Sequence, residues 1–280
     1  MADQSVYSAA SVEVVKWEGG RAVAAREELA REEPLEVRVR GRAITVTMRT
    51  PGRLDDDGVS VEDAELAAGF LLTEGVIRSR VDIDKIEHCG RNEWGNVVDV
   101  RLSPLVHVDF ERLTRHVFAA SSCGLCGKAS IAQVRGSHAA VVSEVRVQAE
   151  MLHVMVAAMR KQQGTFDRTG GLHAAGLFAA DGTMIVVRED IGRHNAVDKV
   201  IGHALLGAVE LKDAVLVVSG RTSFEIVQKA VAGRVPIVAG VSAPSSLAVE
   251  FAREMGMTLV GFLRENRMNI YAGVERVVMQ

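Results

Sequence analysis

Two of the three cysteines of this chain, Cys123 and Cys126, lie in the segment SSCGLCGKAS, residues 121–130. Cysteines at this spacing can share a metal ion, form a redox-active disulfide or carry a sulfur atom as a persulfide. Glycines and serines surround both thiols, which predicts an exposed loop. The residue types therefore predict thiol chemistry and leave open which of the three reactions takes place.

A metal site would need further ligands. A structural zinc ion takes four, and His88 with Cys89 would complete a Cys3His set, although at no recognisable spacing. A zinc deaminase needs His-x-Glu followed by Pro-Cys-x-x-Cys, whereas alanines follow His173 and the cysteine pair precedes it. We therefore predict no bound metal, with structural zinc as the alternative.

Redox chemistry and sulfur transfer make different demands on this loop. A thioredoxin-type dithiol lies between a strand and a helix, whereas this pair follows a short helix predicted over residues 108–118. Sulfur transfer needs an exposed loop and a thiolate stabilised by nearby positive charge, such as that of Lys128. On the residues alone, sulfur transfer, dithiol exchange and zinc binding all remain open.

Polar clusters stand at the ends of several predicted strands, where ligands bind in α/β sheets. TGGLHAAG places His173 among glycines that let a ligand approach closely, with a hydrogen-bonded structural histidine as the alternative. REDIGRHNAVDK places Arg193 and other ionisable residues at the start of a helix, which predicts a site, with a salt-bridged helix start as the alternative. The apolar stripe of that helix predicts that Asp198 and Lys199 lie off its buried face.

The segment SGRTSFE follows the most apolar strand of the chain. Thr222 and Glu225 fit a capping box for the next helix and need no function. The capping box does not explain Gly220 and Arg221. A Gly-Arg turn at a helix N-terminus is a suitable binding site for an anion.

The closing segment GFLRENRMNIY ends the last predicted strand with Arg264 and Arg267. Two arginines there can form a solvated edge, or they can hold a phosphate or a guanine edge through their forked donors. The sequence thus predicts a second seat for an anionic ligand.

These clusters require a framework of strands and helices to bring them together. Alternation around Gly41 predicts a hairpin over residues 35–49, and Ser60 predicts the cap of a helix over 60–77. Methionines and Leu152 share one face of a helix over 148–164, and a hairpin turns at Asp181-Gly182. Helices over 194–206, 222–232 and 245–256 then alternate with the strands AVLVVSG, PIVAGVS and MTLVGFL. We predict an α/β fold, a sheet with helices on both faces.

Composition sets limits on the class of protein. The chain has 280 residues, 48% of them hydrophobic, and a formal charge of −3, so bulk charge does not attract nucleic acid. We expect a flexible segment over residues 1–20, a β-rich part over 21–120 and an α/β part over 121–280. We see no signal peptide and no apolar run long enough to span a membrane, and we expect a cytoplasmic protein.

Five segments in order resemble the FdhD family, the formate dehydrogenase accessory sulfurtransferases: SSCGLCGKASI, TGGLHAAGLF, EDIGRHNAVDKVIG, VSGRTSFEIVQKA and LVGFLRENRMNIY. The likeness spans about residues 115–275 and is weaker upstream. It implies a cytidine deaminase-like three-layer fold without the zinc chemistry. It also implies a homodimeric sulfur carrier, with cysteine desulfurase and formate dehydrogenase as partners and no nucleic acid or membrane.

The resemblance also implies roles for particular residues. Cys123 would carry the persulfide, Cys126 would assist, and the acceptor would be the molybdenum cofactor, Mo-bis(molybdopterin guanine dinucleotide). The residues implied in holding that cofactor are Phe262, Leu263, Arg264, Glu265, Asn266 and Arg267. We add His173, Arg193, Gly220 and Arg221 from the clusters described above, and we expect GDP to act as a partial mimic of the cofactor. A cofactor-binding chaperone that transfers no sulfur is the alternative.

Overall fold

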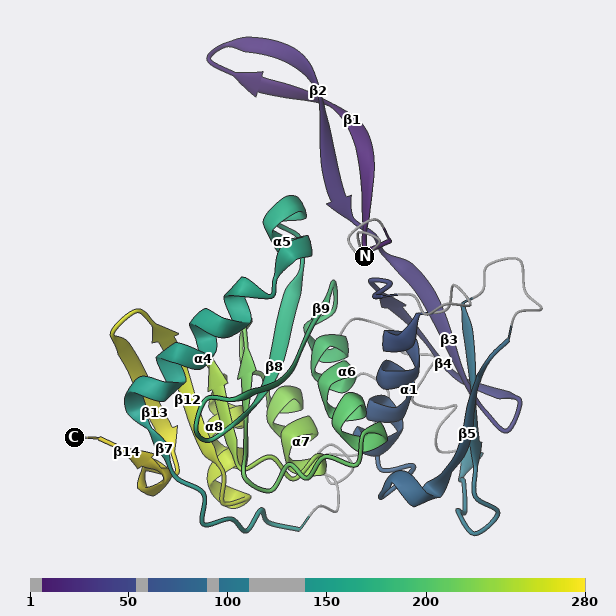
Figure 1. Cartoon of the computed structure of the whole chain (residues 1–280), viewed down its shortest axis with the longest axis vertical. Helices are drawn as coiled ribbons and strands as arrows, with labels where there is room; N and C mark the ends of the chain where they lie inside the picture. The colour runs from purple at the N-terminus through teal and green to yellow at the C-terminus, as the bar shows by residue number, and fades with distance from the viewer. Residues whose placement is uncertain (1–6, 54–59, 90–95, 111–138, 280) are drawn as a thin grey trace.

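The computed structural model describes residues 7–53, 60–89, 96–110 and 139–279 (Figure 1). Its strands fall into a two-stranded arm, a four-stranded sheet, a six-stranded sheet and a short pair formed by β7 (Val147–Gln148) and β14 (Val277–Val278). No helix of the described ranges is both long and apolar enough to cross a membrane.

The N-terminal strands form an arm that stands away from the rest of the chain (Figure 1). β1 (Ala9–Glu18) and β2 (Arg21–Ala30) pair antiparallel over ten residues without a register shift. Gly19 and Gly20 connect them with φ values of 57° and 82°, the left-handed backbone that a tight hairpin turn requires. The sequence analysis expected a flexible segment over residues 1–20, and the regular strand β1 corrects it. Alternation in SVEVVKWE was the signal for that strand.

The β-rich part forms a mixed sheet covered by one helix. The strand order is β4-β3-β6-β5, and the predicted hairpin around Gly41 is confirmed as β3 and β4. Helix α1 is shorter than expected, because the chain turns after Thr73 through Glu74 and Gly75. The bounds are β3 (Glu33–Val39), β4 (Arg42–Arg49), α1 (Val61–Thr73), β5 (Ile83–His88) and β6 (Val97–Leu102). The predicted helix over 108–118 and the boundary at residue 120 lie outside the described residues, apart from the start of that helix.

The α/β part is built on a sheet of order β13-β12-β11-β10-β8-β9. β10, β11 and β12 are parallel, whereas β8, β9 and β13 run antiparallel to their neighbours. The sequence analysis missed β13 and the short helix α5. The bounds are α4 (Ala149–Lys161), α5 (Gly164–Thr169), β8 (His173–Ala179), β9 (Met184–Asp190), α6 (Arg193–Leu206), β10 (Ala214–Val218), α7 (Phe224–Ala232), β11 (Ile237–Gly240), α8 (Ser246–Glu254), β12 (Thr258–Arg264) and β13 (Arg267–Ala272).

Helices cover both faces of this sheet, as predicted. Leu152, Met155 and Met159 of α4 pack on one face, so the methionine stripe belongs to the core. Helices α6, α7 and α8 pack on the other face (Figure 1). The mixed α/β architecture with three layers is therefore confirmed.

Helix α1 of the β-rich part packs on helix α6 of the α/β part, and their backbones come closest at two glycines. A β-carbon on Gly69 would lie 1.9 Å from the carbonyl oxygen of Asp198, and one on Gly202 would lie 1.8 Å from that of Glu65. Since these distances are far below van der Waals contact, only glycine lets the two backbones approach so closely.

Gly202→Ala is therefore expected to lower the free energy of unfolding by about 1–3 kcal/mol, the usual cost of overpacking, although alanine favours a helix. Urea unfolding would measure it. Gly164→Ala is the matched control, because a β-carbon there has nothing within 4 Å. Equal stability of both variants would contradict the close crossing.

Candidate functional site

Several strands begin or end at one edge of the six-stranded sheet. The parallel strands β10, β11 and β12 have their carboxyl ends there, β8 begins there and β9 ends there. His173 opens β8 and pairs with Asp190 at the end of β9. Arg193 opens α6 just beyond, and Gly220 and Arg221 follow β10. We call this region the carboxyl edge, and it collects residues that the sequence predicted separately.

Gly220 lies close to both His173 and Arg193. A β-carbon on Gly220 would lie 3.2 Å from His173 Nδ1 and 3.8 Å from Arg193 Cδ. Any side chain at position 220 would press against the imidazole. Glycine therefore lets the backbone after β10 approach the imidazole closely.

Positive groups converge on the half-buried His173. Burial lowers the pKa of His173, and the charges of Arg193, His194 and Arg221 lower it further. The imidazole is therefore neutral near pH 7 and lies among cationic neighbours. Such an environment favours an anionic ligand.

His194 and Glu225 form a pair beside this cluster. His194 Nε2 lies 3.0 Å from Glu225 Oε2 and 3.4 Å from Ser223 Oγ. Burial acts to raise the pKa of Glu225, but the contact with His194 and the charges of Lys229 and Arg193 together outweigh it and lower the pKa. The predicted capping box is wrong: Ser223 is the N-cap of α7, it makes no side-chain cap bond, and Glu225 bonds to α6 instead.

Two buried polar atoms near this edge have no partner among the described residues. They are Arg193 Nε and the hydroxyl of the fully buried Thr222. A β-carbon on Gly240 would lie 2.4 Å from Thr222 Oγ1, so this hydroxyl points towards the end of β11. Arg193 thus has a buried donor within the cationic cluster, which suits binding of an oxyanion.

Residues 262–267 occupy the same edge but do not act as one unit. Phe262 is 37% exposed and has φ of 51°, and its amide donates to Ser242 O over 3.1 Å. Leu263 is fully buried in the core beneath α4. Arg264 Nε donates to Val241 O over 3.0 Å. The structure therefore leaves Leu263 no exposed side chain with which to contact a ligand.

The remaining residues of that segment form the turn between β12 and β13. Glu265 and Asn266 are exposed, and Arg264 pairs with Arg267 across the hairpin. Glu265 has φ of 47°, as tight turns require. The segment is therefore a hairpin tip, because β13 follows where the sequence analysis expected a strand edge.

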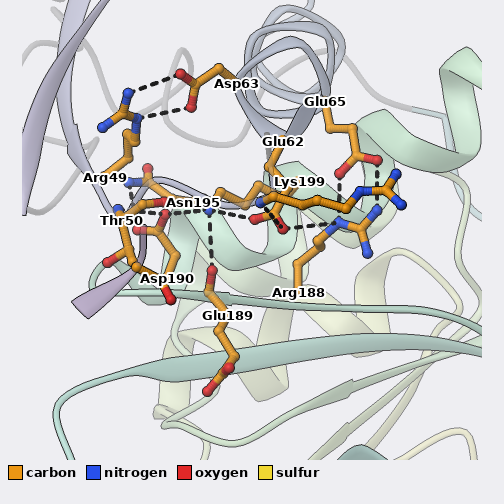
Figure 2. A network of polar contacts seen from close by, with 12 residues as sticks. Arg49, Thr50, Glu62, Asp63, Glu65, Arg188, Glu189, Asp190, Asn195 and Lys199 are labelled. Carbon is orange, nitrogen blue, oxygen red and sulfur yellow. Dashed lines mark hydrogen bonds and ion pairs between the residues drawn. The ribbon is translucent and has the colours of Figure 1, made fainter. Parts of the chain in front are cut away.

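The segment REDIGRHNAVDK supports the edge through a buried ionic network (Figure 2). Lys199 Nζ lies 2.9 Å from Asp190 Oδ2 and 3.0 Å from Glu62 Oε2, and it donates to the carbonyls of Thr50 and Glu189 over 2.9 and 3.1 Å. Burial opposes charge on Lys199, but the two carboxylates outweigh it and raise its pKa. Lys199 therefore joins β4, α1, β9 and α6.

The prediction that Asp198 and Lys199 lie off the buried face is wrong. Both are buried, at 3% and 0% exposure, because α1 covers the side of α6 that faces away from the sheet. Asp198 accepts hydrogen bonds from Lys229 Nζ and from Thr73 Oγ1. These acidic and basic residues are therefore internal ion pairs.

Two arginines extend the network (Figure 2). Arg49 donates to both carboxylate oxygens of Asp63 over 2.8 and 2.9 Å. Arg188 likewise donates to both carboxylate oxygens of Glu65 over 2.7 and 2.8 Å. His203 Nδ1 lies 2.8 Å from Glu65 Oε1. Sequence reasoning missed Glu62, Asp63 and Glu65, although three acids in an otherwise apolar helix were a signal.

The network reaches the carboxyl edge through Asp190. Its Oδ1 accepts from the amide of Gly192 over 2.8 Å and from Asn195 Nδ2 over 3.0 Å. Asn195 Nδ2 also donates to Met48 O over 2.7 Å. The first turn of α6, which carries Arg193, is therefore fixed to the β-rich part.

The two cysteines that began the sequence analysis, Cys123 and Cys126, lie outside the described residues. Cys89 directly follows β5, and its amide donates to Val97 O over 2.9 Å. The described ranges contain no cluster of three histidine, cysteine or acidic side chains arranged to hold a metal ion.

Comparison with known proteins identifies the family of this chain. The chain is a mixed α/β protein with a cluster of cationic residues at the carboxyl edge of its sheet, and residues 30–278 match the family model described as "FdhD/NarQ family". The chain belongs to the FdhD/NarQ family.

Curated relatives cover nearly the whole chain. A protein of Streptomyces coelicolor is 50% identical over 262 residues, which cover 90% of this chain and 89% of that protein. One of Mycobacterium tuberculosis is 49% identical over 262 residues, covering 90% and 92%. Both are named "Sulfur carrier protein FdhD".

A solved structure shares the fold. It comes from Desulfotalea psychrophila and is described as a formate dehydrogenase accessory protein. It superposes with a TM-score of 0.76 at 24% identity, covering 96% of this chain and 99% of that one.

Proposed function

We propose that this protein is a cytoplasmic sulfur carrier that accepts persulfide sulfur on Cys123 and delivers it to a molybdenum cofactor. The observation that best supports this proposal is membership of the FdhD/NarQ family. The chain is about 50% identical to proteins named sulfur carriers, and it contains a Cys-x-x-Cys pair. The donor is a cysteine desulfurase, and the acceptor is Mo-bis(molybdopterin guanine dinucleotide), used by formate dehydrogenase.

The loading step is a thiol–persulfide exchange. The Cys123 thiolate attacks the terminal sulfur of the desulfurase persulfide, a new S–S bond forms, and the desulfurase thiolate leaves. Cys123 then carries the sulfur as a persulfide. No net oxidant is consumed, because the sulfur moves between two thiols.

The delivery step uses the second thiol. The Cys126 thiolate attacks the inner sulfur of the Cys123 persulfide, a Cys123–Cys126 disulfide forms, and hydrosulfide leaves towards the bound acceptor. A cellular thiol reductant must then reduce that disulfide.

The carboxyl edge is the proposed binding site of the acceptor, the molybdenum cofactor. Arg193 and Arg221 would meet its phosphates, with the neutral His173 beside Gly220 as a hydrogen-bonding neighbour. The exposed tip of residues 264–267 would meet its nucleotide end. Support comes from the buried Arg193 donor and the positive charges that lower the pKa of His173.

Intact mass spectrometry tests the proposal directly. After incubation with a cysteine desulfurase and cysteine, the protein should gain the mass of one sulfur atom and lose it on treatment with dithiothreitol. Cofactor binding without any such gain would favour the chaperone alternative.

The nucleotide end of the acceptor gives a second test. We expect GDP to bind more tightly than ADP, because Glu265 and Asn266 can accept from the guanine N1 and N2 hydrogens. Arg264→Ala should weaken GDP binding by about 1.5–3 kcal/mol, a typical charged hydrogen bond. Calorimetric titration measures both quantities.

The matched control is Arg160→Ala, which removes an exposed arginine of α4 that pairs with Asp167 and is not among the residues assigned to the carboxyl edge. Its affinity for GDP should equal that of the wild type. Equal binding of GDP and ADP would contradict a guanine site at the hairpin tip.

A further inference from the structure

Thr50 directly follows β4, at the junction of the β-rich part and the α/β part. The residue is 2% exposed, and the proline after it favours an extended backbone at Thr50. Its hydroxyl donates to the carbonyl oxygen of Arg31 over 2.8 Å and accepts from the amide of Ile191 over 3.2 Å. One buried hydroxyl therefore connects segments that lie 19 and 141 residues away along the chain.

The main chain of Thr50 bonds to the same junction. Its amide donates to Asp190 Oδ2 over 3.1 Å, and its carbonyl oxygen accepts from Lys199 Nζ over 2.9 Å. Figure 2 shows Thr50 beside Asp190 and Asn195. The amide, the carbonyl and the hydroxyl of this one residue are thus all bonded to other segments.

Ile191 and Gly192 form the turn that joins β9 to α6. β9 ends at Asp190, which pairs with His173 on β8, and α6 begins at Arg193. The amide of Gly192 donates to Asp190 Oδ1 over 2.8 Å. The position of this two-residue turn therefore determines where Arg193 lies relative to His173.

We propose that Thr50 is a positioning residue for ligand binding at the carboxyl edge, and that its hydroxyl holds the turn of Ile191 and Gly192 in place. This role rests on the function proposed above, in which Arg193 meets the phosphates of the acceptor. Arg193 Nε is a buried donor without a partner among the described residues. Such a donor can bind an oxyanion well only where its backbone is held in the correct position.

The hydroxyl acts on a different point of the chain from the ion pair. Lys199 fixes the carboxylate of Asp190 at the end of β9, over 2.9 Å. The amide that Thr50 Oγ1 binds belongs to Ile191, one residue nearer to Arg193. Thr50→Val removes the hydroxyl and keeps the bonds of the main chain to Asp190 and Lys199. The variant therefore releases the turn and leaves the ion pair intact.

Thr73 provides a control that separates positioning from a merely structural role. It is a second buried threonine, at 4% exposure. Its hydroxyl donates to Asp198 Oδ1 over 2.8 Å and accepts from Lys229 Nζ over 3.0 Å. Thr73→Val thus removes a buried hydroxyl of the same kind, and the contacts that it removes belong to the internal ion pair of Asp198 and Lys229.

Calorimetric titration with GDP measures the effect on binding. Thr50→Val should bind GDP about threefold to tenfold more weakly than the wild type, the equivalent of losing one neutral hydrogen bond. Thr50→Ser keeps the hydroxyl and should restore the affinity of the wild type. Thr73→Val should lose a comparable amount of stability in urea and keep the affinity of the wild type. Equal affinity of Thr50→Val and wild type, or an equal loss in Thr73→Val, would overturn the positioning role.

Hydrogen exchange followed by NMR tests the turn without a ligand. In the wild type, the amide of Ile191 should be protected, because it is bonded inside the protein. Thr50→Val should speed its exchange about threefold to tenfold, by the loss of the same hydrogen bond, whereas Thr73→Val should not. An unprotected Ile191 amide in the wild type would overturn the proposal even if Thr50→Val failed to fold. Failure of the wild type to bind GDP would contradict the binding site proposed above, whereas unchanged exchange in Thr50→Val would contradict the role of Thr50 alone.

Discussion

Cys123→Ala is expected to abolish sulfur transfer while leaving the protein folded. The persulfide requires a thiolate at this position, and alanine cannot replace it. Incubation with a desulfurase and ³⁵S-labelled cysteine should label the wild type and leave the variant unlabelled. Formate dehydrogenase should remain inactive in cells that contain only the variant.

The other cysteines serve as controls. Cys126→Ala should still be labelled but should deliver sulfur more slowly, because the attack that releases hydrosulfide is lost. Cys89→Ala should behave as the wild type, since Cys89 lies beside β5 in the β-rich part. Full activation of formate dehydrogenase by Cys123→Ala would remove the carrier mechanism.

The Cys123→Ala variant also distinguishes a sulfur carrier from a cofactor-binding chaperone that transfers no sulfur. A chaperone would need only the carboxyl edge, so Cys123→Ala should keep its affinity for GDP under either function. Loss of labelling with unchanged GDP binding identifies a carrier that also binds a cofactor. Full activation together with unchanged GDP binding identifies a chaperone.

Local patterns predicted the elements of the sheet well. The apolar runs AVLVVSG, PIVAGVS and MTLVGFL are confirmed as β10, β11 and β12, because a strand buried on both faces needs a continuous apolar run. Since parallel strands share one edge, the polar residues after them could be expected to converge. His173, Gly220 and Arg193 do so.

What the pattern could not predict depends on contacts between distant segments. Lys199 lies beside the apolar stripe of α6, so the pattern predicts that it faces solvent. In the structure, α1 packs on that side of α6 and buries it. Only the two glycines, Gly69 and Gly202, allow α1 to come so close. The acids of α1 and the bases of α6 and β9 are individually ordinary, and their pairing requires the tertiary structure.

Leu263 shows a different limit of the sequence. The resemblance implied the whole segment 262–267 in holding the cofactor, yet alternate residues of a strand face opposite sides. The structure places Leu263 in the core under α4 and Phe262 at the surface. A motif that spans a strand end therefore contains both surface and core residues.

Lys199→Met is expected to cause the largest loss of stability. It leaves the carboxylates of Asp190 and Glu62 buried without their shared ammonium, and breaking a buried pair costs about 3–5 kcal/mol. Urea unfolding at pH 7 measures this loss. Lys212→Met is the matched control, because Lys212 is exposed and its ion pair with Glu210 is exposed too. It should change stability by less than about 1 kcal/mol.

The pH dependence of this loss identifies its cause. Burial acts to raise the pKa of Glu62, but Lys199 and Arg188 outweigh it and lower the pKa. In the wild type, the contribution of Glu62 is present above its unfolded pKa and is lost as the pH falls through the lowered folded value. Without Lys199, burial opposes the charge of Glu62 more strongly, and protonation of Glu62 relieves the unpaired charge. The difference in unfolding free energy between wild type and Lys199→Met should therefore shrink as the pH falls from 7 towards 5. A difference that does not change with pH would mean that lost packing, and not lost pairing, destabilises the variant.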